Sequence, residues 1–252
     1  MNCLILAAGE GKRLRPLTSD RPKCLVELWG KPLLEHLADV IGGFGFETVG
    51  IVCGYQSERL VEWAKNRPGV RLFHNPEFAA TNMVHSLFCA PSMLDGPLII
   101  SYSDIVYVPD VMRRLLEADA QFAVVVDRDW KRLWSLRMAD PLADAETMKL
   151  DSRGNIRELG KKPRSYADIE GQYIGLFKWQ GEALSLVREQ HHRINRQDEA
   201  RLRSMYMTDF IQGLIDGGAE AKAVPIDGGW LEVDTLQDLR FYEERPGFLL
   251  GR

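Results

Sequence analysis

The stretch from Cys3 to Glu27 constrains the fold of this chain more than any other. An unbroken apolar run, Cys3 to Ala8, is followed at once by a loop that contains Gly9 and Gly11. Apolar runs without polar alternation are typical of strands buried on both faces, as in parallel sheets. The glycines allow backbone N–H groups to close around an anion without a Cβ in the way. The stretch therefore predicts an α/β fold with an anion site after its first strand.

Basic residues follow the glycines directly. Lys12, Arg13 and Arg15 precede Pro16, and Lys23 comes shortly after. Their charge would favour a polyphosphate, although a tight turn with solvated cations would give a similar pattern. The loop is not a Walker motif, which closes with Gly-Lys and Ser or Thr, nor the dinucleotide fingerprint, because its third glycine is missing.

Taken together, these residues resemble the signature of the sugar-phosphate nucleotidyltransferase family. The matching residues are Leu-Ala-Ala-Gly-x-Gly-x-Arg-Leu-x-Pro-Leu-Thr, from Leu6, and Arg-Pro-Lys-Cys-Leu-Val, from Arg21. Such enzymes transfer a nucleoside monophosphate from an NTP to a phosphorylated acceptor and release pyrophosphate. The resemblance implies a Rossmann-like, GT-A-like fold with a mixed, mainly parallel sheet flanked by helices. It also implies nucleotide binding by Leu6, Ala7, Ala8, Gly9, Gly11, Lys12 and Arg13, and catalysis by Arg13 and Lys23.

Strands and helices alternate through the first half of the chain. The patterns predict strands over 48–53, 70–74 and 122–127, and helices over 33–44, 58–65 and 108–118. This rhythm is typical of a parallel sheet covered by helices on both faces. Ligands of such sheets bind beyond the carboxyl ends of the strands, where the glycine loop is expected.

Two apolar segments end abruptly on a carboxylate. The strand predicted over 97–103 leads to Asp104, and the segment from Trp230 to Val233 leads to Asp234. A turn former or a helix cap would give the same pattern. Mg²⁺ prefers one or two carboxylates, with phosphate oxygens and waters as its other ligands. Because the family resemblance places metal ligands at both positions, we expect Asp104 and Asp234 to bind Mg²⁺ as the cofactor.

The segment from Asn75 to Leu87 bears on the nucleotide. Thr81 or Asn82 is expected to cap a helix that runs to residue 89. The segment also resembles its counterpart in the cytidylyltransferase branch of the family. That resemblance implies that Thr81, Asn82 and Ser86 face the base and that the nucleotide is CTP.

The second half resembles the acceptor-binding half of the same branch, whose members act on phosphocholine, aminoethylphosphonate or phosphoglutamine. The segments that carry this resemblance begin at Asp129, Asp144 and Glu170. Those that begin at Ser103, Asp144 and Glu158 favour the phosphoglutamine enzymes of capsule phosphoramidate synthesis. The residues implied to bind the acceptor are Trp130, Glu146, Lys161, Tyr173 and Asp209. Tryptophan beside acidic residues suits a small cationic group. Packing over the sheet for the tryptophan, and a solvated surface for the lysine, remain open alternatives.

Composition excludes some classes of partner. A net charge of −4 over 252 residues argues against general nucleic-acid binding. No apolar run approaches the length of a membrane span, and the start of the chain lacks a signal-peptide pattern. The four cysteines are scattered, which favours reduced thiols in the cytoplasm. We expect one domain over 1–252, with a nucleotide-binding part over about 1–127 and an acceptor-binding part over about 128–245, and leave a homo-oligomer open.

The sequence thus predicts a CTP-dependent cytidylyltransferase that transfers CMP to a small phosphorylated or phosphonate acceptor. One alternative is a sugar-1-phosphate nucleotidyltransferase that uses another NTP. A second is an inactive, nucleotide-sensing regulatory subunit on the same fold. The second alternative requires the loss of a loop cation or of a metal carboxylate, and this chain has all of them.

Overall fold

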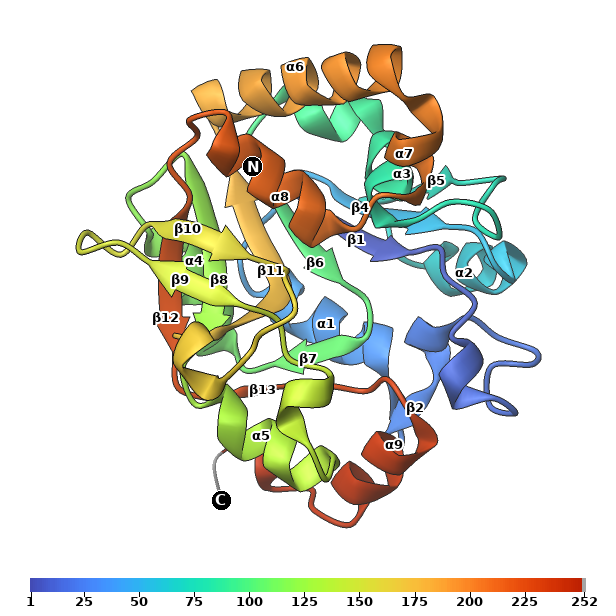
Figure 1. The fold of residues 1–252 in the computed structure, drawn as a ribbon. Helices are drawn as coiled ribbons and strands as arrows, with labels where there is room; N and C mark the ends of the chain where they lie inside the picture. The colour runs from blue at the N-terminus through green and yellow to red at the C-terminus, as the bar shows by residue number, and fades with distance from the viewer. Residues whose placement is uncertain (251–252) are drawn as a thin grey trace.

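A seven-stranded sheet forms the centre of the computed structural model, which describes residues 1–250 (Figure 1). The strand order is β12-β8-β11-β6-β1-β4-β5, and all neighbours are parallel except β11, which is antiparallel to β6 and β8. The strands are β1 (Asn2–Ala7), β4 (Val49–Cys53), β5 (Val70–His74), β6 (Leu98–Tyr102), β8 (Phe122–Asp127), β11 (Gln172–Trp179) and β12 (Lys222–Ile226). This arrangement confirms the expected mixed, mainly parallel sheet.

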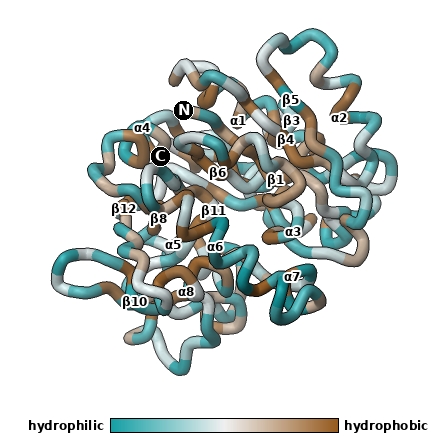
Figure 2. Tube along the Cα trace, turned by 90° about the horizontal axis from the view of Figure 1, so that it is seen from above, coloured by the Kyte–Doolittle hydropathy of each residue, from teal (hydrophilic) through white to brown (hydrophobic). Residues whose placement is uncertain are grey.

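Helices cover both faces of the sheet. One face carries α1 (Leu33–Gly42), α2 (Ser57–Ala64) and α4 (Pro109–Glu117), and the core of this face continues to α5 (Trp130–Arg137) and α9 (Leu236–Glu243). The other carries α3 (Met83–Phe88), α6 (Glu182–Gln197), α7 (Glu199–Ser204) and α8 (Met207–Asp216). Figure 2 shows largely hydrophilic residues along α7, which lies at the edge of the molecule. Short 3-10 turns connect the larger elements: η1 (Lys12–Leu14), η2 (Lys23–Leu25), η3 (Pro91–Asp95), η4 (Pro141–Ala143), η5 (Tyr166–Asp168) and η6 (Phe248–Leu250).

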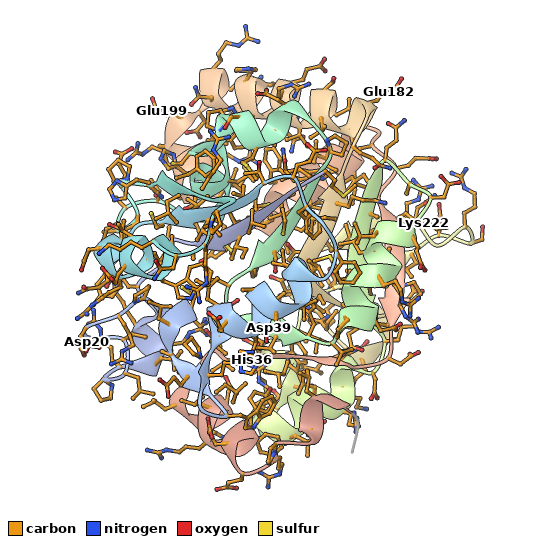
Figure 3. All side chains as sticks on the ribbon, turned by 180° about the vertical axis from the view of Figure 1, so that it is seen from behind. Asp20, His36, Asp39, Glu182, Glu199 and Lys222 are labelled. Atoms are coloured by element: carbon orange, nitrogen blue, oxygen red, sulfur yellow. The ribbon has the colours of Figure 1, made fainter. Side chains whose placement is uncertain are left out.

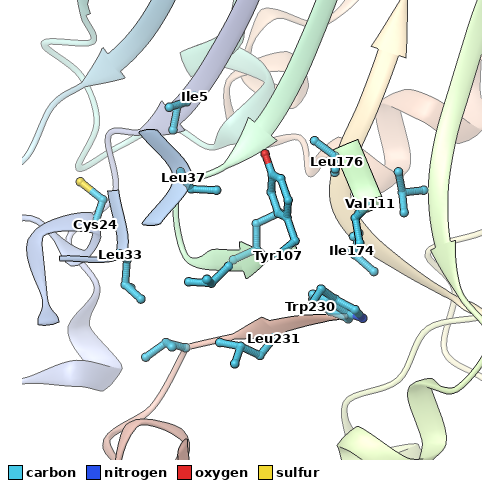
Figure 4. Packing of buried hydrophobic residues seen from close by; sticks show 14 of the residues in the cluster. Ile5, Cys24, Leu33, Leu37, Tyr107, Val111, Ile174, Leu176, Trp230 and Leu231 are labelled. Carbon is cyan, nitrogen blue, oxygen red and sulfur yellow. The ribbon is translucent and has the colours of Figure 1, made fainter. Parts of the chain in front are cut away.

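The first strand is apolar throughout because it is buried on both sides. Cys3 and Ile5 contact the core under α1 and α4, whereas Leu4 and Leu6 contact the core under α3 and α6. Successive side chains of a strand point to opposite faces, so both sets must be apolar. In Figure 4, Ile5 lies with Leu37 in the core of the first face.

Three two-stranded ladders lie outside the main sheet. They are β2 (Glu27–Leu28) with β3 (Lys31–Pro32), β9 (Met148–Leu150) with β10 (Ile156–Leu159), and β7 (Ile105–Tyr107) with β13 (Trp230–Glu232). The β7–β13 ladder is antiparallel and packs into the core, where Tyr107 lies near Trp230 and Leu231 (Figure 4). It joins two segments that are distant in sequence.

Some elements differ from the sequence-based expectation. Residues 131–142 show no clear period in sequence, yet Trp130–Arg137 forms α5. Its buried positions are Trp130, Leu133, Trp134 and Arg137, a helical stripe whose last member is a charged residue. Thr208 and Asp209 are residue types typical of a helix N-cap. However, α8 begins at Met207 and its N-cap residue is Tyr206. Among residues 1–250, no helix is both long and apolar enough to cross a membrane.

Candidate active site

The glycine loop folds back onto the turn that carries Lys23. Gly11 adopts a left-handed backbone with φ of 59°, and a Cβ on it would lie 2.9 Å from the Lys23 Cβ. The Thr18 hydroxyl donates a 2.9 Å hydrogen bond to the Gly11 carbonyl and fixes the loop. Glycine is therefore required here for both its conformation and its lack of a side chain.

Lys23 bridges the two predicted metal carboxylates. Its Nζ lies 2.7 Å from Asp104 Oδ2 and 2.7 Å from Asp234 Oδ1. The Arg13 guanidinium contacts the second oxygen of Asp234 at 2.5 Å. The two carboxylates meet because Val233 N donates a 2.9 Å hydrogen bond to the Asp104 carbonyl, which continues the β7–β13 ladder. The structure thus brings together four residues predicted from separate motifs.

Burial and charge oppose each other in this cluster. Burial lowers the pKa of Lys23, but the negative charges of Asp104 and Asp234 outweigh it, so the pKa is raised and the ammonium stays protonated. Glu232 lies on the adjacent strand β13. Burial raises the pKa of Glu232 to about 7, against the opposing charge of Arg137. Burial and the neighbouring charges therefore shift the pKa values of this cluster in opposite directions.

A cavity of about 400 Å³ opens at the carboxyl ends of β1 and β6, next to this cluster. Its predicted lining residues are Leu6, Ala7, Gly9, Gly11, Lys12, Arg13, Lys23, Asp104 and Asp234. Its other lining residues, which sequence reasoning did not single out, are Glu10, Phe78, Ala79, Met83, Tyr102 and Ser103. Of these, Glu10 lies within the glycine motif, where its ion pairs with Lys12 at 3.2 Å and Arg15 at 3.1 Å have no sequence signal.

The carboxylate pair fits a magnesium ion that also binds phosphate. Within residues 1–250, no group of three or more His, Cys, Asp or Glu side chains is arranged to hold a metal. Mg²⁺ needs only one or two protein carboxylates when phosphate oxygens and waters complete its octahedron. The Asp104 Oδ1 atom is buried without a hydrogen-bond partner, so an acceptor lone pair is available at this position.

The residues expected to face the base make local hydrogen bonds instead of lining the cavity. The Asn82 side chain caps α3 by accepting from Met83 N at 2.8 Å. The Asn75 amide donates to the hydroxyls of Thr81 and Ser86, at 3.0 Å in each case. The expected cap on α3 is thus confirmed, while the base contacts stay a prediction.

The residues expected to bind the acceptor divide into two groups. Burial, together with the charges of Asp209 and Asp144, raises the pKa of Glu146 to about 7. The Tyr173 ring lies 5.8 Å from that of Tyr102, edge to face, beside the same acidic group.

The other two, Trp130 and Lys161, contact residues outside this acidic group. Trp130 is only 4% exposed and packs 6.0 Å from Trp134. The exposed Lys161 pairs with Glu158 at 2.6 Å. The packing role for the tryptophan is therefore present, and the acceptor contacts of both residues stay a prediction.

Comparison with known proteins shows the family to which the chain is similar. The profile of the MobA-like NTP transferase domain matches residues 3–173. A CTP:phosphoglutamine cytidylyltransferase from Campylobacter jejuni is 42% identical, over 97% of this chain and 100% of that protein. A UTP–glucose-1-phosphate uridylyltransferase from Haloferax volcanii is 33% identical, over 97% of this chain and 96% of that protein.

Solved structures share the fold. The structure of CTP:phosphocholine cytidylyltransferase from Streptococcus pneumoniae has a TM-score of 0.76, at 21% sequence identity, and covers 96% of this chain and 97% of that one. The sheet with helices on both faces is therefore a fold that is already known.

Proposed function

This chain belongs to the MobA-like NTP transferase family and is a nucleotidyltransferase, and from that premise we propose its substrates. We propose that it transfers CMP from CTP to a small phosphorylated acceptor, with phosphorylated glutamine as the first candidate, and releases pyrophosphate. The observation that carries the proposal is the bridge of Lys23 between Asp104 and Asp234 beside the glycine loop. It lies in a chain that resembles a CTP:phosphoglutamine cytidylyltransferase along both of its halves.

The reaction needs no protein nucleophile, because the acceptor already carries an anionic oxygen that attacks the α-phosphorus in line. Catalysis then consists of positioning two anions and neutralising their charge. We assign Lys12 and Arg13 to the β- and γ-phosphates, since both line the cavity beside the loop N–H groups. Lys23 would neutralise charge at the α-phosphate and at the attacking oxygen.

We assign Mg²⁺ binding to Asp104 and Asp234. When bound, the ion would add positive charge at the α-phosphate and at the leaving pyrophosphate. Lys23 and Arg13 form ion pairs with these carboxylates. In the proposed reaction each cation exchanges a carboxylate for a phosphate oxygen when the nucleotide binds.

The acceptor would lie on the side of Glu146 and Asp209. Two carboxylates near each other favour an ammonium group, and phosphorylated glutamine carries one. We assign Lys161 to the acceptor phosphate and Trp130 and Tyr173 to its hydrocarbon part. All four cysteines are free thiols, so we also expect the protein in the reducing cytoplasm.

The test is pyrophosphate release measured over a panel of nucleotides and acceptors. Purified protein is assayed with CTP, UTP, dTTP and GTP against phosphorylated glutamine, phosphocholine, aminoethylphosphonate and glucose 1-phosphate. We expect release with CTP and one of the amine-bearing acceptors, with the nucleotidyl product identified by mass spectrometry.

Two other outcomes would overturn this proposal. Turnover with UTP and glucose 1-phosphate would support the sugar-nucleotide alternative, which the similarity to the uridylyltransferase keeps open. Nucleotide binding without release for any acceptor would support the regulatory alternative. A variant such as Asp39→Asn, on the exposed surface of α1, serves as the control preparation.

A further inference from the structure

Arg137 is a buried charge outside the cavity, and sequence reasoning gave it no role. It ends α5 and is only 5% exposed. Its Nε lies 2.9 Å from Asp238 Oδ1, and its Nη2 lies 3.1 Å from Asp238 Oδ2. The same Nη2 contacts Glu232 Oε2 at 3.1 Å. One guanidinium thus holds carboxylates from both α9 and β13.

Both carboxylates connect Arg137 with residues of the active site. Asp238 Oδ2 accepts hydrogen bonds from the backbone N–H groups of Asp234, at 3.1 Å, and Thr235, at 2.8 Å. The oxygen that receives the arginine therefore also fixes the main chain of the carboxylate that pairs with Lys23 and Arg13. Glu232, the last residue of β13, precedes Asp234 by two residues, and its negative charge acts on Lys23.

The arginine also connects α5 with α9, two helices that are distant in sequence. The Gln237 amide donates a 3.1 Å hydrogen bond to the Arg137 carbonyl, which ties the end of α5 to α9. The helix α5 begins at Trp130, a residue that we assign to the acceptor. A displacement of α5 would therefore reach the Asp234 backbone through the arginine and Asp238.

We propose that Arg137 is a positioning residue for the nucleotidyl transfer: it orients Asp234 through Asp238 without touching substrate. This inference rests on the proposed function of Asp234. A buried ion pair is a weak source of stability, because a packed apolar side chain often serves as well. The arginine fixes the orientation of the two carboxylates, because its planar guanidinium contacts three carboxylate oxygens at once and the ammonium of a lysine does not.

The test begins with Arg137→Lys, which keeps the charge and approximate size but loses the fork. Outer-shell partners of a metal ligand typically contribute about 10- to 100-fold to activity, and we expect a loss in kcat of this size. The KM for CTP should change little, because Lys12 and Arg13 remain in place. Arg137→Met, which leaves two carboxylates unpaired, should show the same loss in kcat if it folds.

A double-mutant cycle separates positioning from general stabilisation. In an Asp234→Asn background, Arg137→Lys should lower kcat by no more than about twofold, because the group it positions is gone. The control is Arg67→Met, which breaks a bidentate pair with Glu35 elsewhere in the protein and should not affect kcat. Thermal unfolding of each variant shows whether the fold is retained.

The outcomes are distinct. Wild-type kcat in Arg137→Lys, or an equal loss in the Asp234→Asn background, would overturn the positioning role while leaving the proposed function intact. Absence of CTP-dependent pyrophosphate release in the wild type would instead contradict the proposed function itself.

Discussion

Each cation that lines the cavity is paired with a carboxylate. Lys12 pairs with Glu10, Arg13 with Asp234, and Lys23 with both metal carboxylates. The carboxylates offset the repulsion among the three cations, which would be costly in a partly buried site. In the proposed reaction each cation exchanges its carboxylate for a phosphate. The affinity for CTP then depends on the difference in free energy between the cation–phosphate pairs and the cation–carboxylate pairs.

Asp104 offers the simplest test of the carboxylate pair. Asp104→Asn should lower kcat by about 100-fold or more, because it removes a ligand of the Mg²⁺ ion whose positive charge would act on the reacting phosphates. The fold should persist, since the asparagine keeps the size and the β7–β13 ladder does not involve the side chain. The measurement is steady-state pyrophosphate release at saturating Mg²⁺, with thermal unfolding alongside.

Asp39→Asn is the matched control. Asp39 lies on α1, on the face of the molecule seen in Figure 3, and its partner is Lys31. The Asp39→Asn variant should retain wild-type turnover. Near-normal kcat in Asp104→Asn would remove this residue from the metal site.

Glu146 predicts a pH dependence for the acceptor. Burial raises its pKa from 4.5 to about 7, so it becomes neutral as the pH falls below that value. The KM for an amine-bearing acceptor should then rise as the pH falls from about 8 to about 6, by no more than about tenfold per unit. Glu146→Gln should show a high KM that depends less on pH, which separates the carboxylate from the titration of the acceptor phosphate.

The same shift predicts the direction of a stability change. A carboxyl whose pKa is raised on folding adds stability below its unfolded pKa, and this contribution is lost as the pH rises through the folded pKa. Glu146→Gln should therefore unfold at a higher temperature than the wild type at about pH 8. An unchanged acceptor KM and an unchanged unfolding temperature would both contradict the assignment.

At the level of elements, the β7–β13 ladder determines the site. It contains only three residue pairs, yet it brings Asp104 and Asp234 to the same Lys23 ammonium. A buried carboxylate supports it: Asp127, at the end of β8, accepts hydrogen bonds from Trp230 Nε1 at 2.8 Å and Gly228 N at 2.9 Å. Short ladders of this kind depend on such anchors because isolated two-stranded pairs are marginally stable.

A second element-level feature is the irregular stretch of β11, where the register with β8 shifts between Tyr173 and Phe177. Gly175 lies there with φ of 81°, and a Cβ on it would lie 2.5 Å from the Tyr102 ring. Gly175→Ala should lower the free energy of unfolding by about 2–4 kcal/mol, from backbone strain and from overlap with the ring. Because Tyr102 lines the cavity, the KM for CTP should rise as well.

Gly30→Ala separates the two causes. Gly30 also has positive φ, at 71°, but nothing lies within 4 Å of a Cβ placed on it. It should lose only the backbone share, about 1–2 kcal/mol, with no effect on the KM for CTP. Equal losses in the two variants, by chemical denaturation, would show that the contact with Tyr102 is not important.

Sequence patterns could locate elements with regular periods but not the contacts between them. The strands β5 and β8 have the predicted bounds, since apolar runs and turn residues define them. The helix α5 was missed because Arg137 occupies its buried stripe, where the pattern requires an apolar residue. The strand β7 was missed because three residues are too few to show a period.

At the scale of the whole molecule, the two predicted parts share one sheet. The strands β11 and β12, from the part assigned to the acceptor, pair with β6 and β8 from the part assigned to the nucleotide. Motifs could predict the glycine loop, Lys23 and the two carboxylates, because each has a local signature. They could not predict Glu10, Glu232 or Arg137, whose importance depends on partners elsewhere in the fold. The division near residue 127 stays a prediction.

The central claim is that a CTP triphosphate lies against the glycine loop while one divalent ion joins Asp104 and Asp234. A crystal structure with a non-hydrolysable CTP analogue and Mn²⁺, whose anomalous scattering locates the ion, tests it directly. We predict an ion bound to both carboxylates and to phosphate oxygens, with the Lys23 ammonium moved from the carboxylates to the α-phosphate. An ion held elsewhere, or a nucleotide outside the cavity between Gly9 and Asp104, would contradict the account.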